Sequence, residues 1–247
     1  MKLKKIEPKF VEKKNPKIGL ISLASDFRIE KDFNEVINHN EIDLYTNRIH
    51  SYNPLTNKNL KKMANDITAV TADILPNQKL DCIAYGCTSG TIAAGYKSIY
   101  DKVNLAKPNT KVTTPITSTI NALKALRINK LSIFTPYTDE INQSVINYFE
   151  KENIEISGLT YFDIASDLDI GKVNPDYLFD VLSKIDLSNS DALFVSCTAL
   201  PVLSIIKDLE KKMSKIVLSS NQTLIWDTFK QIDFKSKVEG YGELFNN

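Results

Sequence analysis

The chain has 247 residues and a formal net charge of +1, because 31 lysines and arginines face 30 aspartates and glutamates. This balance argues against a protein that binds nucleic acid or a membrane surface, which would carry a basic excess. Three cysteines are too few for a disulfide framework, and no run of about 18 apolar residues could span a bilayer. The first residues are charged and lack the apolar core of a secretion signal, so we expect a cytoplasmic protein with reduced thiols.

Short apolar runs alternate with longer amphipathic segments along the chain. In chain order we predict a strand over 18–23, a helix over 60–75, strands over 80–85, around 112 and over 131–134, helices over 141–150 and 177–185, a strand over 192–195, a helix over 201–213 and a strand over 216–218. The strand runs are continuous rather than alternating, which is typical of strands buried on both faces. This order predicts an α/β fold with mainly parallel sheets.

The two halves of the chain repeat one pattern. Asp81 and Asp191 each begin a stretch of five mostly apolar residues that is followed by Cys-Thr. The runs that start at residues 17 and 111 have counterparts at 130 and 215. We therefore predict two pseudo-symmetric Rossmann-like lobes, over 17–125 and 126–235, each with a mainly parallel four-stranded sheet. Residues 1–16 would form an N-terminal arm and residues 236–247 a C-terminal tail, with the active site in the cleft between the lobes.

The repeat places Cys87 and Cys197 at equivalent strand ends. Ligands of open α/β sheets bind at the carboxyl ends of the strands. If the lobes face each other, the two thiols line one cleft from opposite sides and can move protons on both faces of a small carbon acid. Racemases and isomerases that work without a cofactor need this arrangement.

The residues around these thiols favour reactivity. Cys87 precedes a predicted helix, whose free N–H groups would stabilise a thiolate. The same groups and the hydroxyls of Thr88 and Ser89 could hold a carboxylate or a developing enediolate. Cys197 and Thr198 form a second turn of this kind. By contrast, Cys82 lies in mid-strand and is predicted to be an ordinary core residue.

The sequence gives no sign of a metal or cofactor site. It contains no Cys-x-x-Cys spacing and no Walker or Rossmann glycine pattern. His39 and His50 lie in polar surroundings and are predicted to be surface residues. We therefore expect chemistry by the thiols alone, without a metal or a cofactor.

Several stretches together resemble the cofactor-independent Asp/Glu racemase superfamily. The resemblance is greatest to the branch of maleate cis-trans isomerase, arylmalonate decarboxylase and the ectoine-utilisation protein EutA. It covers roughly residues 17 to 230, and the matching stretches are Ile18–Ile21, Tyr85–Gly90, Thr113–Thr117, Phe134–Tyr137, Val195–Thr198 and Ser220–Gln222. The segments 23–33 and 220–226 look most similar to EutA.

The resemblance implies roles for individual residues. Cys87 and Cys197 would be the two catalytic cysteines, and Thr88, Ser89, Tyr137 and the N–H of Thr198 would hold the substrate carboxylate. In a maleate isomerase, one thiolate adds to the alkene, the new single bond rotates and elimination gives fumarate. In a racemase, the thiols exchange protons on opposite faces. The family also implies a homo-oligomer, a dimer or larger.

Departures from the family patterns bear on the substrate. Ala199 stands where glutamate racemases have a histidine, and Cys87 is present where arylmalonate decarboxylases lack a cysteine, so both branches are disfavoured. Asp26 stands where maleate isomerases place an asparagine. An aspartate there would repel a dicarboxylate and favour an ammonium group, or it could simply cap the helix that starts near Arg28. The family places another polar contact near residues 167 and 169, where the alignment does not separate Asp167 from Asp169.

Four functional hypotheses follow. The first is a two-thiol isomerase or racemase that acts on a small carboxylate or amino-acid derivative, similar to EutA and connected to ectoine catabolism. The alternative is a maleate cis-trans isomerase. An arylmalonate-type decarboxylase and a non-catalytic ligand sensor are weaker alternatives, and the presence of both cysteines argues against the sensor.

Overall fold

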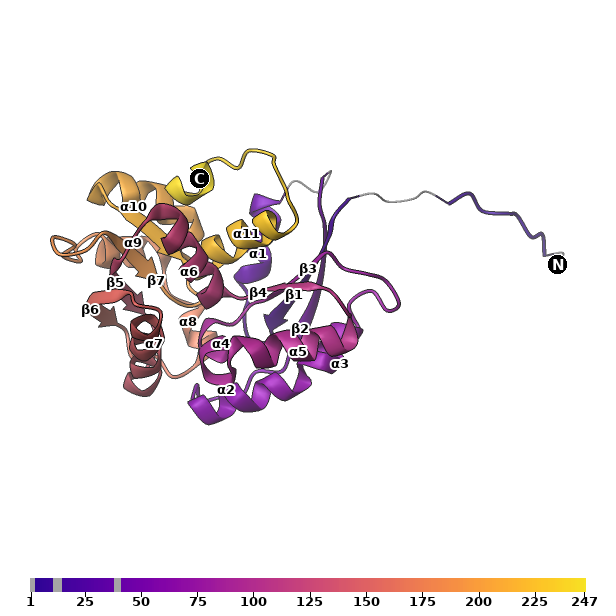
Figure 1. Ribbon diagram of the computed structural model, residues 1–247, viewed down its shortest axis with the longest axis horizontal. Helices are drawn as coiled ribbons and strands as arrows, with labels where there is room; N and C mark the ends of the chain where they lie inside the picture. Colours follow the sequence, from indigo (N-terminus) through magenta and orange to yellow (C-terminus); the bar gives the residue numbers. More distant parts are fainter. Residues whose placement is uncertain (1–2, 11–14, 38–40) are drawn as a thin grey trace.

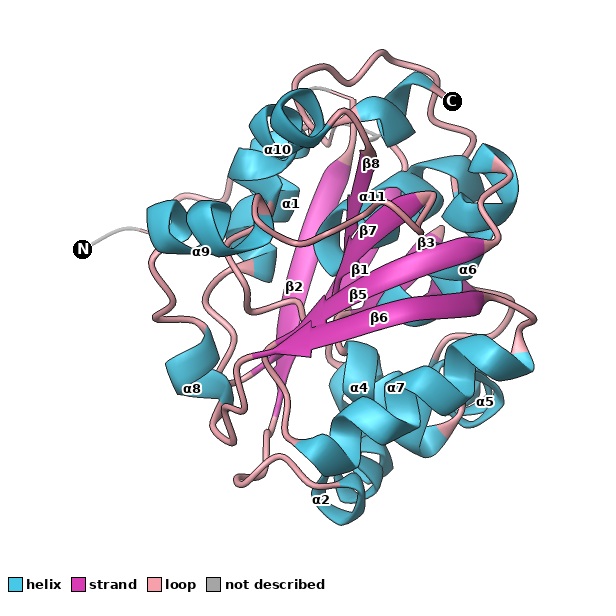
Figure 2. Cartoon of the chain, turned by 90° about the vertical axis from the view of Figure 1, so that its left-hand side faces the viewer, coloured by secondary structure: helices cyan, strands magenta, loops and turns pink. Residues whose placement is uncertain are grey.

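Two parallel sheets form the centre of the structure, a computed structural model that describes residues 3–10, 15–37 and 41–247. The first sheet has the strand order β2-β1-β3-β4 and the second the order β6-β5-β7-β8 (Figure 2). The strands are β1 (Lys17–Leu23), β2 (Asp43–Ile49), β3 (Cys82–Tyr85), β4 (Lys111–Thr113), β5 (Lys130–Thr135), β6 (Glu155–Tyr161), β7 (Ala192–Val195) and β8 (Ile216–Ser219). The predicted α/β fold with two four-stranded parallel sheets is confirmed.

Helices cover both sheets (Figure 1). They are α1 (Ile29–Val36), α2 (Asn57–Met63), α3 (Ile67–Ala72), α4 (Thr88–Ala94), α5 (Tyr96–Ala106), α6 (Pro115–Leu126), α7 (Asp139–Lys151), α8 (Asp167–Ile170), α9 (Pro175–Leu182), α10 (Ile206–Met213) and α11 (Ser220–Gln231). The helix predicted over 60–75 is broken by a 3₁₀ turn at Ala64–Asp66, where Asn65 and Asp66 are poor helix formers. None of the described helices is long and apolar enough to cross a membrane.

The sequence repeat has a structural cause at the start of each half. The N–H of Lys17 donates to Asp81 Oδ2 at 2.7 Å, and the N–H of Lys130 donates to Asp191 Oδ2 at 3.0 Å. In each half the aspartate therefore joins the first strand to the strand that leads to the cysteine. The two lobes repeat this local architecture, as the sequence pattern predicts.

The edge strands β2 and β6 are the elements that apolar runs do not reveal. Strand β6 is exposed along much of its length and β2 is mostly half-buried, and their sequences are correspondingly polar. A strand at the edge of a sheet is covered by fewer neighbours, so its sequence need not form a continuous apolar run.

Contacts between the halves centre on α6 and α11, which pack against each other. Asp227 of α11 accepts hydrogen bonds from Ser118 at 2.8 Å and Asn121 at 3.1 Å, both on α6. Helix α11 also contacts β3 and β4 of the first sheet. The last helix of the second half thus completes the first half, and the lobe boundary at 125/126 stays a prediction.

The two chain ends differ in their packing. Of the predicted arm, residues 3–10 extend away from the body of the molecule (Figure 1), and residues 1–2 and 11–14 lie outside the described residues. The tail is anchored, because Leu244 is fully buried and the carbonyl of Tyr241 accepts a hydrogen bond from Gln222. His50 is exposed as predicted, whereas His39 lies outside the described residues.

Gly86 provides a test of how tightly the first half is packed beneath the site. A Cβ atom at Gly86 would lie 2.5 Å from Ile29 Cδ1 and 3.2 Å from the backbone carbonyl oxygen of Ile21, whereas a Cβ at Gly158 would meet only Ser132 Oγ at 3.7 Å. We expect Gly86→Ala to lower the free energy of unfolding by about 1–3 kcal/mol, the usual cost of overpacking a core. Gly158→Ala should stay within about 0.5 kcal/mol of wild type. Urea denaturation measures both, and equal stabilities would contradict the described packing.

Candidate active site

The two candidate catalytic thiols lie at equivalent strand ends but in different backbone conformations. Cys87 is extended, with φ −145°, and caps α4, where its Sγ accepts a hydrogen bond from the N–H of Gly90 at 3.2 Å. Cys197 follows β7 with φ +96°, a left-handed conformation that is strained for any residue except glycine. Strain of this kind concentrates at functional sites, because the surrounding structure must hold it in place. Both thiols are buried.

Ser220, the first residue of α11, links the two cysteine turns. Its Oγ accepts a hydrogen bond from Thr88 Oγ1 at 2.9 Å and another from the N–H of Cys197 at 3.0 Å. The Ser220 hydroxyl therefore holds Thr88, the residue after Cys87, next to Cys197. The structure brings Cys87 and Cys197 to a single site, as predicted, and adds Ser220, to which we had assigned no role.

Tyr137 lies beside both thiols. Burial raises the pKa of its phenol well above the usual value, and the negative charge of Cys197 and then of Cys87 would raise it further. Ser196 donates a 3.4 Å hydrogen bond to its hydroxyl. Tyr137 therefore keeps its proton, and its phenol can donate a hydrogen bond to an anionic ligand; that it binds the substrate carboxylate stays a prediction.

The other predicted ligand-binding residues also meet here. Ser89 Oγ lies 4.0 Å from Cys87 Sγ. Thr198 Oγ1 donates across the two halves to the carbonyl of Gly86 at 3.4 Å. Thr88 and Ser89 are the first two residues of α4, whose N–H groups have no acceptor within the helix. This corner of the site therefore offers hydroxyl and amide donors suited to a carboxylate.

The acidity of the thiols differs from the sequence-based expectation. The N–H of Gly90 does lower the pKa of Cys87, but burial has the larger effect and raises it to about 12. Burial also raises the pKa of Cys197 well above its usual value, and the carboxylates of Asp167 and Asp26 raise it further. Both thiols are thus neutral at pH 7 while the site is closed, and the prediction of a stabilised thiolate is wrong for this state.

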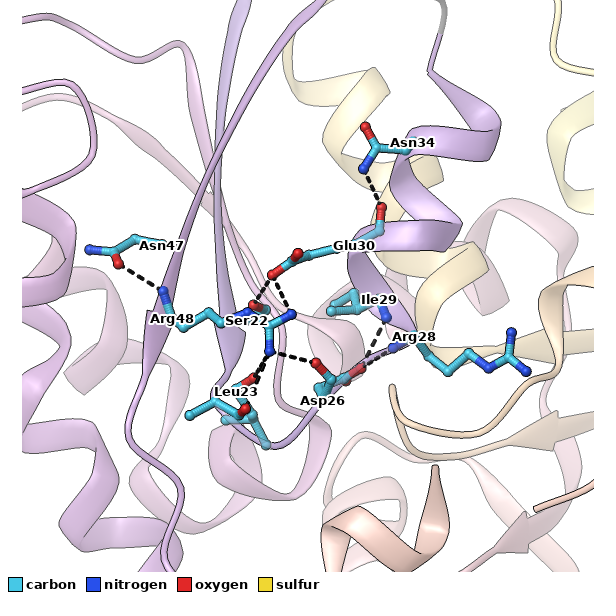
Figure 3. A network of polar contacts seen from close by, with 10 residues as sticks. Ser22, Leu23, Asp26, Arg28, Ile29, Glu30, Asn34, Asn47 and Arg48 are labelled. Carbon is cyan, nitrogen blue, oxygen red and sulfur yellow. Dashed lines mark hydrogen bonds and ion pairs between the residues drawn. The ribbon is translucent and has the colours of Figure 1, made fainter. Parts of the chain in front are cut away.

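Asp26 has two differently placed carboxylate oxygens. Oδ1 accepts hydrogen bonds from the N–H groups of Arg28 at 2.7 Å and Ile29 at 3.0 Å, so it caps the start of α1 (Figure 3). Oδ2 is buried and has no hydrogen-bond partner among the described residues. Burial raises the pKa of this carboxyl group. Capping of α1 therefore explains the position of Oδ1 but not that of Oδ2.

Asp167, at the first position of α8, is a second buried carboxylate of the site. Its Oδ2 accepts a 2.5 Å hydrogen bond from Ser25 in the other half. Burial raises its pKa to about 6, and Asp26 contributes to the rise. Asp169 instead forms an ion pair with Lys172 at the surface. Of the two aspartates, Asp167 is therefore the one that the structure places at the site.

Asn221 fastens the second cysteine turn to the first half. Its Nδ2 donates to Asp32 Oδ2 at 2.7 Å and to the carbonyl of Thr198 at 2.8 Å. Asp32 is buried, and burial raises its pKa to about 7 although the bond from Asn221 lowers it. Asn221 thereby joins α1, α11 and the turn after Cys197. Sequence reasoning noted its stretch but gave it no role.

The third cysteine takes no part in the site. Cys82 is buried in β3 with its Sγ 3.8 Å from Thr113 Oγ1, as expected for a core thiol. Within the described ranges, no group of three or more histidine, cysteine, aspartate or glutamate side chains is placed to hold a metal ion.

The site is closed. All seven predicted residues and Asp167 are buried, and Ser25 and Thr198 each donate a hydrogen bond from one half of the chain to the other. We therefore expect one of the surrounding segments to move when a ligand binds. The short helix α8, with its single turn, is held to the first half through Asp167 at this position.

Comparison with known proteins identifies relatives along most of the chain. The arylmalonate decarboxylase family profile matches residues 57–245. Two curated relatives are maleate isomerases. The one from Geobacillus stearothermophilus is 25% identical, covering 94% of this chain and 98% of its own, and the one from Alcaligenes faecalis is 27% identical, covering 70% and 71%.

Solved structures show the same fold. One is a cysteine-to-serine mutant of the maleate cis-trans isomerase from Nocardia farcinica, with a covalently bound succinylcysteine intermediate. It matches with a TM-score of 0.85 at 19% identity, covering 93% of this chain and 98% of its own.

The raised pKa of Asp32 predicts a pH-dependent stability. A carboxyl group with a higher pKa in the folded state binds its proton more tightly when folded, so its contribution to stability is lost as pH rises from about 4 to about 7. Asp32→Asn keeps the oxygen that accepts from Asn221 and should remove this loss, on the order of a few kcal/mol. Denaturation at pH 5 and pH 8 measures the difference. Asp101→Asn, an exposed control, should follow wild type, and parallel pH profiles of wild type and Asp32→Asn would contradict the raised pKa.

Proposed function

Because the chain belongs to the arylmalonate decarboxylase family and holds two thiols at one buried site, we propose that it is a cofactor-independent cis-trans isomerase. The substrate is a small cis-2-enoate, and the reaction is of the maleate isomerase type. The observation that carries this proposal is the Ser220 bridge, which places Thr88 and Cys197 against each other. Two thiols around one small ligand suit nucleophilic addition by one and proton transfer by the other.

The relatives favour this reading over the ectoine-related one. Both curated relatives described above are maleate isomerases. None of the comparisons supports a connection to ectoine, so the alternative of a maleate-type isomerase replaces our first hypothesis. Arylmalonate decarboxylation remains the less favoured activity, because it does not require the thiol of Cys87.

Cys87 is the nucleophile in this proposal. Its Sγ accepts a hydrogen bond from the N–H of Gly90 at the start of α4, which lowers the pKa of the thiol against the larger effect of burial. Cys87 first loses its proton to solvent while the site is open to its ligand. The thiolate then adds to the alkene carbon β to the bound carboxylate and forms a C–S bond. The π-electron pair moves to the α-carbon and into the carboxylate, giving an enediolate.

The remaining steps restore the enzyme. Cys197 lends its proton to the α-carbon, and the substrate rotates about the bond that was the double bond. Cys197 takes a proton back, the electron pair re-forms the double bond in the trans geometry, and the C–S bond breaks to release the Cys87 thiolate. No atom is gained or lost, and no external oxidant or reductant is needed.

The corner with amide and hydroxyl donors stabilises the charged intermediate. The N–H groups of Thr88 and Ser89 and the phenol of Tyr137 are donors near the thiols. Negative charge on the carboxylate oxygens increases when the enediolate forms, so donors fixed in a buried site stabilise it more than the ground state.

Replacing either thiol tests this proposal. We expect Cys87→Ser and Cys197→Ser each to lower kcat for a cis-2-enoate by about 10³-fold or more, because each removes one of two cooperating groups. Cys82→Ser, which alters a core thiol outside the site, should keep kcat within about 3-fold of wild type, since it leaves the reacting groups in place. Proton NMR of cis and trans products measures the rates, starting with maleate, maleamate and cis-4-aminobut-2-enoate. Full activity in either single variant would refute the two-thiol mechanism.

A further inference from the structure

Two buried carboxylates, those of Asp26 and Asp167, lie near the two thiols. Asp26 follows β1 in the first half, and Asp167 begins α8 in the second half. The 2.5 Å hydrogen bond from Ser25 to Asp167 joins the two loops, so the carboxylates form one wall, here called the acidic wall. Each of them raises the pKa of both Cys87 and Cys197, which places the wall next to the reacting groups.

The acidic wall has a free acceptor. Asp26 Oδ2 is buried and unpartnered, although Oδ1 of the same carboxylate accepts two backbone hydrogen bonds. The Thr198 hydroxyl of the other half lowers the pKa of Asp26, but it donates its hydrogen bond to the carbonyl of Gly86 at 3.4 Å. A buried carboxylate oxygen without a donor is unfavourable, so a ligand that supplies one is strongly favoured.

Two arginines lie near Asp26, and neither pairs with its carboxylate. The side chain of Arg28 points away from Asp26 (Figure 3), and its charge lowers the pKa of Asp32. Arg48 donates to the carbonyls of Ala24 and Asp26 and forms an ion pair with Glu30 at 2.9 Å (Figure 3). Its charge lowers the pKa of Asp26, but it is the weakest of the causes, and burial outweighs it. Among the residues that the structure describes, no lysine or arginine side chain forms an ion pair with either carboxylate of the wall.

We propose that Asp26 and Asp167 form a subsite for a cationic group, so that the preferred substrate is a small monocarboxylate that also carries an ammonium group. This inference rests on the proposed isomerase function and specifies its substrate class. The carboxylate binds at the amide donors of α4, and the ammonium group donates to Asp26 Oδ2 and lies beside Asp167. A dicarboxylate would place its second negative charge against two others in a buried site, where repulsion is poorly screened.

A bound ammonium group would also prepare the thiols for reaction. The carboxylates of Asp26 and Asp167 disfavour a thiolate at Cys87 in the empty site. A cation between them offsets that repulsion, so ligand binding makes the thiolate easier to form. The charge of the ligand should therefore affect kcat as well as KM. If the acidic wall had only a structural role, neither kcat nor KM would depend on the charge of the ligand.

Three ligands with one shape separate the charge effect from the fit. Maleate, maleamate and cis-4-aminobut-2-enoate share a carboxylate and a cis double bond, and their other ends are anionic, neutral and cationic. In a Cys87→Ser background, which prevents turnover, calorimetry should show the amino compound binding at least about 10-fold more tightly than maleate, with maleamate in between.

Charge-neutralising variants locate the effect. Asp26→Asn and Asp167→Asn, added singly to the Cys87→Ser protein, should each lower the ratio of the affinity for the amino compound to that for maleate by about 10-fold. The double variant should bind maleate more tightly than the amino compound. Asp169→Asn is the matched control, because this exposed carboxylate lies on the same helix as Asp167 but pairs with Lys172 at the surface. It should leave the ligand ranking unchanged.

Several outcomes would overturn the proposal. Equal affinities for maleate and for the amino compound in the Cys87→Ser protein would overturn it. This result does not depend on whether the Asp26→Asn/Asp167→Asn double variant folds. An unchanged ranking in a folded double variant would overturn the proposal too. Refutation of the two-thiol mechanism would be a separate result. The ligand preference is measured by binding without turnover, whereas the thiol variants are tested by their reaction rates.

Discussion

Two thiols buried beside two carboxylates are the constraint on which the site depends. In the closed protein, burial alone keeps the Cys87 thiol protonated at neutral pH, and the charges of Asp167 and Asp26 reinforce this. Exposing the thiols to water would relieve the desolvation but would also expose an enediolate to solvent. A site that opens for its ligand and closes around it can instead use the charge of the ligand to generate the reactive form.

The fold creates this arrangement by repeating one local design and then making its two copies unequal. In both halves an aspartate fastens the strand that leads to the cysteine. Cys87 then continues in an extended conformation into a capped helix, whereas Cys197 turns left-handed. Ser220 and Asn221 at the start of α11 hold the strained turn against the first half. The packing of α11 on α6 therefore determines how the two thiols meet.

The central strands and the paired cysteines could be predicted because both leave continuous or repeated signals in the sequence. The edge strands could not, since their partly exposed faces have no continuous apolar run. Ser220 was also beyond sequence reasoning, because a serine that bridges two loops from a distant helix has no spacing that marks it. The same holds for the bond from Ser25 to Asp167, which joins residues 142 positions apart. The thiol acidity was misjudged because local hydrogen bonds can be predicted from the sequence, whereas the degree of burial cannot.

The covalent adduct on Cys87 tests the central claim most directly. Cys197→Ser protein, incubated with a cis-2-enoate, digested and examined by mass spectrometry, should carry the mass of one substrate molecule on the peptide that contains Cys87. The peptide with Cys82 should remain unmodified, because that thiol lies in the core of β3. An adduct confined to another residue, or no adduct in a variant that still converts cis substrate to trans, would contradict nucleophilic catalysis by Cys87.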